Sequence, residues 1–182
     1  MTSEPVPPLL TWIDLEMTGL EPETDVILEA VVVITDCDLL EVAVSETLII
    51  HQPDTTLDSM NAWCVSQHGK SGLTAASRLS ALSTGKAEQQ LLAFLRSHAK
   101  DGEIPLCGTS VHQDRAFLRR HMPALEAFFH YRNIDVSTLK ELARRWYPAL
   151  PKFDKPEAHR ALDDIRASIA ELRYYREHVL RP

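Results

Sequence analysis

The chain has few cysteines, and the three that it has form no recognisable pattern. Cys37, Cys64 and Cys107 are widely spaced and odd in number, which argues against a disulfide framework and against a zinc site. We expect them to be small buried residues in a reducing cytoplasm. No apolar run has the length of a membrane span, and residues 1–8 lack the basic and apolar segments of a signal peptide. The sequence therefore predicts a cytoplasmic protein with no membrane segment.

Basic residues are also scarce. The chain of 182 residues has 19 Lys and Arg against 26 Asp and Glu, which gives a net charge of −7. Broad capture of a long nucleic acid needs many cationic contacts to phosphates, and this balance disfavours it. A nucleotide or a very short oligonucleotide, held by a few placed groups and a metal, stays compatible with it. Length and composition predict one globular domain, residues 1–182, with 1–8 as a short N-terminal tail.

The apolar pattern predicts an α/β protein. Continuous and alternating apolar runs predict five strands, at residues 9–16, 26–35, 42–50, 104–108 and 131–137. Helical periodicity predicts helices at residues 58–69, 84–100, 110–122, 124–130, 139–146 and 157–179, with a loop or a short helical turn at 71–77. Ser110 and Gln113 have the spacing of a capping box at a helix start. This order predicts a mixed five-stranded sheet that is flanked by helices on both faces.

Two acids stand at the end of the first predicted strand. Side chains alternate along a strand, so Asp14 and Glu16 share a face with Trp12. Two carboxylates this close resist joint ionisation unless a cation offsets their charge, and Mg²⁺ or Mn²⁺ prefers oxygen ligands. A strand that ends in two solvent-exposed acids is the alternative interpretation. The pair alone does not decide between the two.

Further acids occur where helices are expected to begin. Asp114 lies one turn into a helix, and Asp163 and Asp164 open the last one. Active sites of open α/β sheets gather at the carboxyl ends of strands, and four carboxylates there would suit two divalent ions that assist phosphoryl transfer. Each acid taken singly could equally be a solvated charge at a helix terminus. His159 could accept a proton from an attacking water, although a lone histidine near a helix start is commonly a surface residue.

Taken together, these motifs resemble the DEDDh branch of the DnaQ-like 3′–5′ exonucleases. The resemblance rests on the segment DLEMTGL at 14–20, on Asp114, on HRALDDI at 159–165, and on residues 60–63, 108–111 and 131–138. It implies a ribonuclease-H-like fold and a metal-dependent 3′–5′ exoribonuclease that degrades very short RNA, dinucleotides in particular, to 5′-mononucleotides. A DnaQ-like enzyme of DNA proofreading or processing and a catalytically silent interaction domain are the alternatives. The low basic charge disfavours the first, and the intact set of acids disfavours the second.

The resemblance also implies a catalytic centre. It assigns His159 as the general base and places two divalent ions, Mg²⁺ or Mn²⁺, on four ligands: Asp14, Glu16, Asp114 and Asp164. Helix geometry agrees with Asp164 rather than Asp163. At about 100° per residue, Asp164 lies roughly 100° from the centre of the apolar stripe of the last helix, whereas Asp163 lies roughly 160° from it.

Substrate contacts follow from the same resemblance. Leu20 and Trp63 would pack against the two bases, since an aromatic platform holds a base of any sequence. Four residues would cap the 5′ phosphate: His68, Ser110, Arg132 and Ser137. Tyr131 would come from the other subunit of a homodimer. Trp63 as a core residue and Ser110 as a plain helix cap remain alternatives, whereas Arg132 has no obvious structural role, because a buried arginine is rare without a partner.

Overall fold

The computed structural model describes residues 9–154 and 160–180. The expected tail at residues 1–8 and His159 lie outside this part of the chain. Within it, a mixed sheet has the strand order β3-β2-β1-β5-β6, and β4 pairs with β2. The strands are β1 (Leu10–Met17), β2 (Ile27–Thr35), β3 (Glu41–Val44), β4 (Leu48–Ile49), β5 (Pro105–Gly108) and β6 (His130–Asp135).

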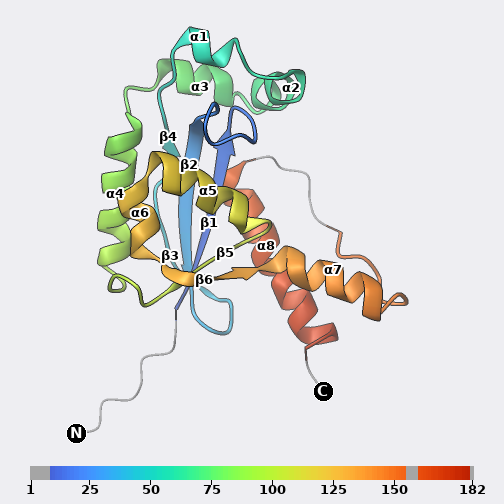
Figure 1. The fold of residues 1–182 in the computed structure, drawn as a ribbon. Helices are drawn as coiled ribbons and strands as arrows, with labels where there is room; N and C mark the ends of the chain where they lie inside the picture. The colour runs from blue at the N-terminus through green and yellow to red at the C-terminus, as the bar shows by residue number, and fades with distance from the viewer. Residues whose placement is uncertain (1–8, 155–159, 181–182) are drawn as a thin grey trace, which may run out of the picture.

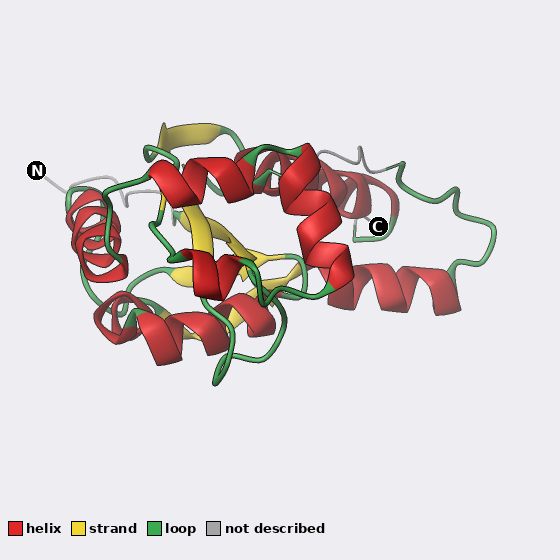
Figure 2. Cartoon of the chain, turned by 90° about the horizontal axis from the view of Figure 1, so that it is seen from above, coloured by secondary structure: helices red, strands yellow, loops and turns green. Residues whose placement is uncertain are grey.

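Helices cover both faces of this sheet (Figures 1 and 2). They are α1 (Asp54–Leu57), α2 (Ala62–Lys70), α3 (Leu73–Leu79), α4 (Thr84–Arg96), α5 (Val111–His121), α6 (Pro123–Phe128), α7 (Val136–Trp146) and α8 (Ala161–His178). Helices α4, α5 and α6 lie against one face, and α7 and α8 against the other. None of the helices in the described ranges is long and apolar enough to cross a membrane.

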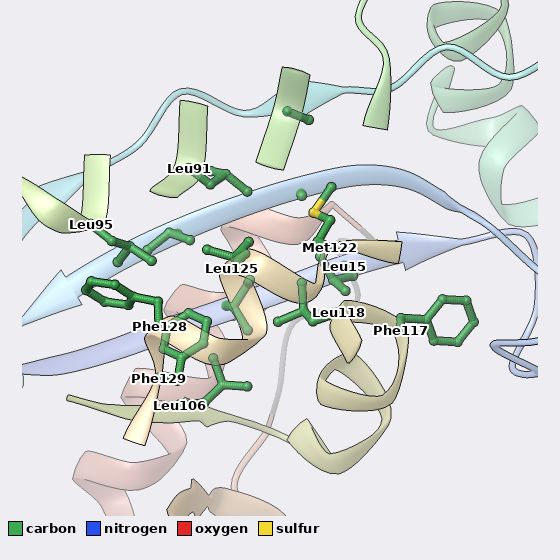
Figure 3. Close-up of a cluster of buried hydrophobic side chains, with 14 of the residues drawn as sticks. Leu15, Leu91, Leu95, Leu106, Phe117, Leu118, Met122, Leu125, Phe128 and Phe129 are labelled. Carbon is green, nitrogen blue, oxygen red and sulfur yellow. The ribbon is translucent and has the colours of Figure 1, made fainter. Parts of the chain in front are cut away.

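The two faces of β1 belong to two different cores. Ile13 and Leu15 pack under α4, α5 and α6, where Leu91 and Leu95 of α4 approach the aromatic end of α6 (Figure 3). Trp12 faces α7 and α8. The predicted alternation is confirmed, and it puts Asp14 and Glu16 on the α8 side because side chains two residues apart share a face.

The central position predicted for the second strand is also confirmed. All nine residues of β2 are buried, and β2 pairs antiparallel with β1, whereas β5 pairs parallel with β1. A strand covered on both faces needs apolar residues at successive positions, which explains the nearly continuous run. Glu29 is the one acid within it, and it lies opposite Glu16 in the pairing register.

The strand expected at residues 42–50 is divided in two, so six strands form instead of five. Ser45 separates β3 from β4. Its backbone N–H donates to Val32 O at 2.9 Å, and its hydroxyl accepts the Val32 N–H at 3.0 Å. Because the side chain takes the place of a backbone carbonyl, the regular ladder is interrupted here.

The helix predicted at residues 58–69 and the capping interaction predicted at Ser110 are wrong, although α5 does begin directly after Ser110. The helix predicted at 139–146 begins earlier, at Val136. The helix expected at 58–69 is replaced by α1 and α2, since the side chain of Asn61 accepts the Cys64 N–H at 2.9 Å and starts α2 afresh. The predicted capping box also fails. Ser110 has φ of 56°, outside the extended region that an N-cap requires, and its side chain makes no capping hydrogen bond. Gln113 instead donates its side-chain amide to the backbone oxygen of Leu20.

The cysteines fulfil their prediction in part. All three are free thiols, and Cys64 and Cys107 are buried as expected. Cys37 is exposed, in the turn that joins β2 to β3. A tight turn places small residues at the surface whatever their polarity. The exposure of Cys37 could therefore not be predicted from its residue type.

Candidate active site

Three carboxylates meet where β1 ends and α8 begins. Asp14 and Glu16 lie on the face of β1 that α8 covers, and Asp164 lies in the first turn of α8. One carboxylate oxygen from each residue lies within 4.8 Å of the other two. Asp163, the neighbouring acid, is exposed. The orientations expected from helix geometry are therefore confirmed, with Asp163 toward solvent and Asp164 at the border of the core.

Asp114 approaches the same strand from the other side. It lies in the first turn of α5, is buried, and accepts the backbone N–H of Leu15 through Oδ1 at 3.0 Å. Leu15 is the residue between Asp14 and Glu16, so the carboxylate is fixed against the peptide that separates the other two acids. Burial raises the pKa of Asp114 to about 7, although the hydrogen bond from Leu15 opposes that shift.

The electrostatics of this cluster favour a cation. Burial, together with the nearby charges of Asp164 and Glu29, raises the pKa of Glu16 to about 8, although Arg160 opposes the shift. A carboxylate among other carboxylates ionises at neutral pH only when positive charge is supplied. A set of oxygen donors of this kind fits a hard divalent ion such as Mg²⁺ or Mn²⁺.

A buried ion pair beside the cluster was missed by the sequence analysis. Glu29 is 1% exposed, and Arg160 Nε lies 3.1 Å from its Oε2 and 3.3 Å from its Oε1. The pair joins β2 to the residue that precedes α8, and the backbone oxygen of Arg160 accepts the Asp164 N–H at 3.0 Å. A lone acid inside the apolar run of β2 was the signal that could have revealed it, because a buried charge needs a partner.

A cleft of about 390 Å³ opens beside Glu16 and contains three of the predicted substrate contacts. Leu20 and Trp63 are exposed, Trp63 by 60%, so Trp63 is not a core residue. His68 is buried, with Nε2 2.8 Å from Met17 O and Nδ1 3.9 Å from Glu16 Oε2. Since a carbonyl oxygen can only accept, Nε2 of His68 carries the proton.

The turn that carries Leu20 is held by one carboxylate. Asp25 accepts the Thr18 hydroxyl at 2.9 Å and the Glu21 N–H at 3.0 Å. A Cβ at Gly19 would collide with this carboxylate, so glycine is required for the close approach. The DLEMTGL segment therefore carries two acids and shapes the cleft wall.

Two of the remaining predicted contacts, Ser110 and Ser137, meet at Asp135, which the sequence analysis did not identify. Its Oδ1 accepts the Ser110 N–H at 2.9 Å, the Ser137 N–H at 2.9 Å and the Ser137 hydroxyl at 2.6 Å. The structure thus brings Ser110 and Ser137 together, at the starts of α5 and α7. Asp135, which caps α7, therefore also fixes the backbone of Ser110. An Asp at a helix start was the sequence signal that could have identified it.

Tyr131 and Arg132 project from β6, an edge strand of the sheet. Tyr131 is 72% exposed, and the Arg132 guanidinium lies 5.2 Å from the centre of its ring. Arg132 is exposed, so its expected burial is wrong. An edge strand presents its side chains to solvent, and edge position cannot be read from the residues of the strand itself.

The fold and the clustered acids define the class of protein. The chain belongs to the RNase_T exonuclease family, whose model matches residues 11–172. Its relatives within that class are oligoribonucleases. That of Pseudomonas syringae pv. tomato is 57% identical over 173 residues, covering 95% of this chain and 97% of its own. That of Thiobacillus denitrificans is 54% identical over 176 residues, covering 96% and 97%.

Solved structures of exonuclease I share the fold. That from Methylocaldum szegediense has a TM-score of 0.71 at 19% identity, over 95% of this chain and 41% of its own. The complex of E. coli exonuclease I with a 5cy-dT13 oligonucleotide has a TM-score of 0.75 at 15% identity, over 97% and 42%. This chain spans about two fifths of those proteins. The similarity confirms the predicted DnaQ-like architecture.

Proposed function

We propose that the chain is a 3′–5′ exoribonuclease that degrades very short RNA, dinucleotides in particular, to 5′-mononucleotides. The observation that carries the proposal is the group formed by Asp14, Glu16 and Asp164, placed beside a cleft of about 390 Å³. A cleft of this size suits one or two nucleotides better than a long strand. The net charge of −7 agrees with it, because processive binding of long RNA draws on many cationic contacts.

The metal centre in this proposal consists of two divalent ions, Mg²⁺ or Mn²⁺. Asp14, Glu16 and Asp164 would hold them, with Asp114 as the fourth ligand across the strand. When bound, the ions supply acidification of the attacking water and neutralisation of the charge that develops on the phosphate and the leaving 3′ oxygen.

This chain's own residues then orient the substrate and move the proton. His159 is assigned as the group that accepts the proton of the attacking water. Glu29 and Arg160 hold the start of α8, and so the Asp164 carboxylate, against the sheet. Leu20 and Trp63 line the cleft, where they would pack against the two bases.

We assign the 5′ phosphate to Ser110 and Ser137, which meet at Asp135, and to Arg132 of β6, together with His68 on the cleft side. Arg132 supplies the positive charge, and hydroxyl donors add directional bonds. The carboxylate of Asp135 would repel a phosphate, so the cap depends on Arg132. Loss of that arginine is therefore expected to remove the preference for the dinucleotide.

The proposal includes a cytoplasmic homodimer in which Tyr131 reaches the site of the other subunit. Support comes from the edge position of β6, from the exposure of Tyr131 and from a neighbouring depression of about 520 Å³ over α5 and α6. An aromatic side chain standing free at a sheet edge is the kind of group that a partner surface covers.

The test is a length series. Purified protein with Mg²⁺ or Mn²⁺ is incubated with 5′-phosphorylated RNA from the dinucleotide up to about ten nucleotides, and with single-stranded DNA of the same lengths. Preference for the dinucleotide supports the proposal. Preference for long DNA would indicate a proofreading or processing enzyme, and no hydrolysis with either ion would indicate an interaction domain.

A further inference from the structure

One arginine outside the acid cluster is buried in a network of hydrogen bonds. Arg115 of α5 is 8% exposed. Its Nη1 lies 3.0 Å from His130 O and 3.2 Å from Tyr131 O, and its Nε lies 2.9 Å from Glu126 Oε1. Nη1 also donates to Asn133 Oδ1 at 2.6 Å. A buried guanidinium is costly unless its donors are used, and here α6 and β6 both use them.

The network sits on an irregularity of β6. In the pairing with β5, Pro105 is opposite His130 but Leu106 is opposite Asn133, so one step on β5 corresponds to three on β6. The two additional residues, Tyr131 and Arg132, form a bulge. A bulge takes backbone groups out of the ladder and redirects the side chains it carries. The guanidinium of Arg115 donates hydrogen bonds to the carbonyl oxygens of His130 and Tyr131 in this bulge.

We propose that Arg115 is a positioning residue that fixes the bulge of β6, so that Tyr131 and Arg132 are presented in the orientation needed to recognise the 5′ end of a dinucleotide. The inference rests on the substrate roles assigned above to Tyr131 and Arg132. The planar fork of arginine presents Nε to Glu126 and Nη1 to the carbonyls of β6, a separation of donors that the single Nζ of a lysine does not reproduce.

The neighbouring Arg119 provides a matched control. It lies one turn later in α5, and its Nη2 contacts the same Glu126 Oε1 at 3.3 Å. Its side chain is 70% exposed. Replacing Arg119 therefore removes a contact with the same carboxylate while leaving the bonds from Arg115 to β6 in place.

The experiment compares Arg115→Lys, Asn133→Ala and Arg119→Met with the unaltered protein. Each is assayed with Mn²⁺ on a 5′-phosphorylated dinucleotide and on the p-nitrophenyl ester of thymidine 5′-monophosphate, a diester with no second nucleotide to cap. Arg115→Lys should raise KM for the dinucleotide about tenfold, the scale of one or two lost hydrogen bonds, and keep kcat on the small diester within about twofold. Asn133→Ala should shift KM in the same direction by less, and Arg119→Met should shift neither.

Hydrogen exchange gives a readout independent of the reaction. Amides of β6 should exchange faster in Arg115→Lys than in Arg119→Met, whereas β1 and β2 should be unchanged. Equal loss on both substrates, or an unchanged KM for the dinucleotide, would overturn the inference. Should Arg115→Lys fail to fold, Asn133→Ala decides by its KM. If the unaltered protein shows no dinucleotide preference, the proposed function fails, and the exchange of β6 still decides whether Arg115 fixes the bulge.

Discussion

Asp163 and Asp164 are chemically identical neighbours whose positions on α8 give them different surroundings. Asp164 belongs to the carboxylate group, and Asp163 points to solvent. Asp164→Asn should lower kcat by on the order of 100-fold or more, since it removes one carboxylate of the proposed metal site. Asp163→Asn should leave most of the activity. The check is steady-state kinetics on the dinucleotide, and equal losses would contradict the assignment.

The raised pKa of Glu16 makes stability depend on pH in a definite direction. Burial, with Asp164 and Glu29 nearby, raises it from 4.5 to about 8, so the folded protein keeps a proton that the unfolded chain releases above about pH 4.5. Without metal, the contribution of this group to stability therefore falls as pH rises from about 4.5 to about 8. The raised pKa of Asp114 lowers stability in the same direction, as pH rises from about 3.8 to about 7.

Divalent ions should reverse that loss because they bind the ionised carboxylates. The rise in Tm on adding Mg²⁺ should be larger near pH 8 than near pH 6, as measured by thermal unfolding in matched buffers. Glu16→Gln removes the group and should lose most of this difference. A Tm increment that is the same at both pH values would show that the carboxylates are already ionised at the lower one.

At the scale of elements, α8 is tied to the sheet at Arg160, the residue that precedes it. Glu29 of β2 is inaccessible to water, while Arg160 is partly exposed. Removing one partner of a buried pair leaves an uncompensated charge, and because solvent reaches the arginine side we expect Arg160→Met to cost about 2 kcal/mol in free energy of unfolding. Urea unfolding at neutral pH measures the change.

Arg166 of the same helix is the matched control for this anchoring. Its Nε lies 2.9 Å from Glu41 Oε1 with both side chains well exposed, so Arg166→Met should cost less than about 0.5 kcal/mol. If Arg160→Met and Arg166→Met have the same effect, the Glu29 pair does not anchor α8. The pH-dependent behaviour of Glu16 should also move in Arg160→Met alone, because Arg160 lowers the pKa of Glu16.

These elements explain what the sequence could and could not predict. Period two in β1 and period 3.6 in α8 determine the faces on which Asp14, Glu16 and Asp164 lie, whereas their meeting was implied by the family resemblance. The Glu29–Arg160 pair joins residues 131 apart and depends on how β2 and α8 come together, which no local pattern contains. The exposure of Arg132 depends on the edge position of β6, and the αL backbone of Ser110 depends on its bond to Asp135. Both are properties of the assembled sheet.

At the scale of the whole molecule, the acids and the exposed edge strand are separate parts of one proposed site. If Tyr131 acts across a dimer interface, Tyr131 and Asp164 of the same chain serve two different active sites of the dimer. Each variant, Tyr131→Ala or Asp164→Asn, should be weakly active or inactive alone on the dinucleotide. A heterodimer of the two would have one site with both an intact acid group and an intact tyrosine.

Mixing the two variants in equal amounts tests this arrangement directly. Half of the dimers that form at random are heterodimers, and each would hold one intact site of two, so activity should return to about a quarter of that of the unaltered protein. The recovery should appear only after subunit exchange, and it should decline on dilution as dimers dissociate. Sedimentation at the assay concentration gives the dimer fraction. Absence of recovery in a sample that is dimeric and exchanged would place Tyr131 in the site of its own chain, because a tyrosine acting within its own subunit cannot complement a chain that lacks Asp164.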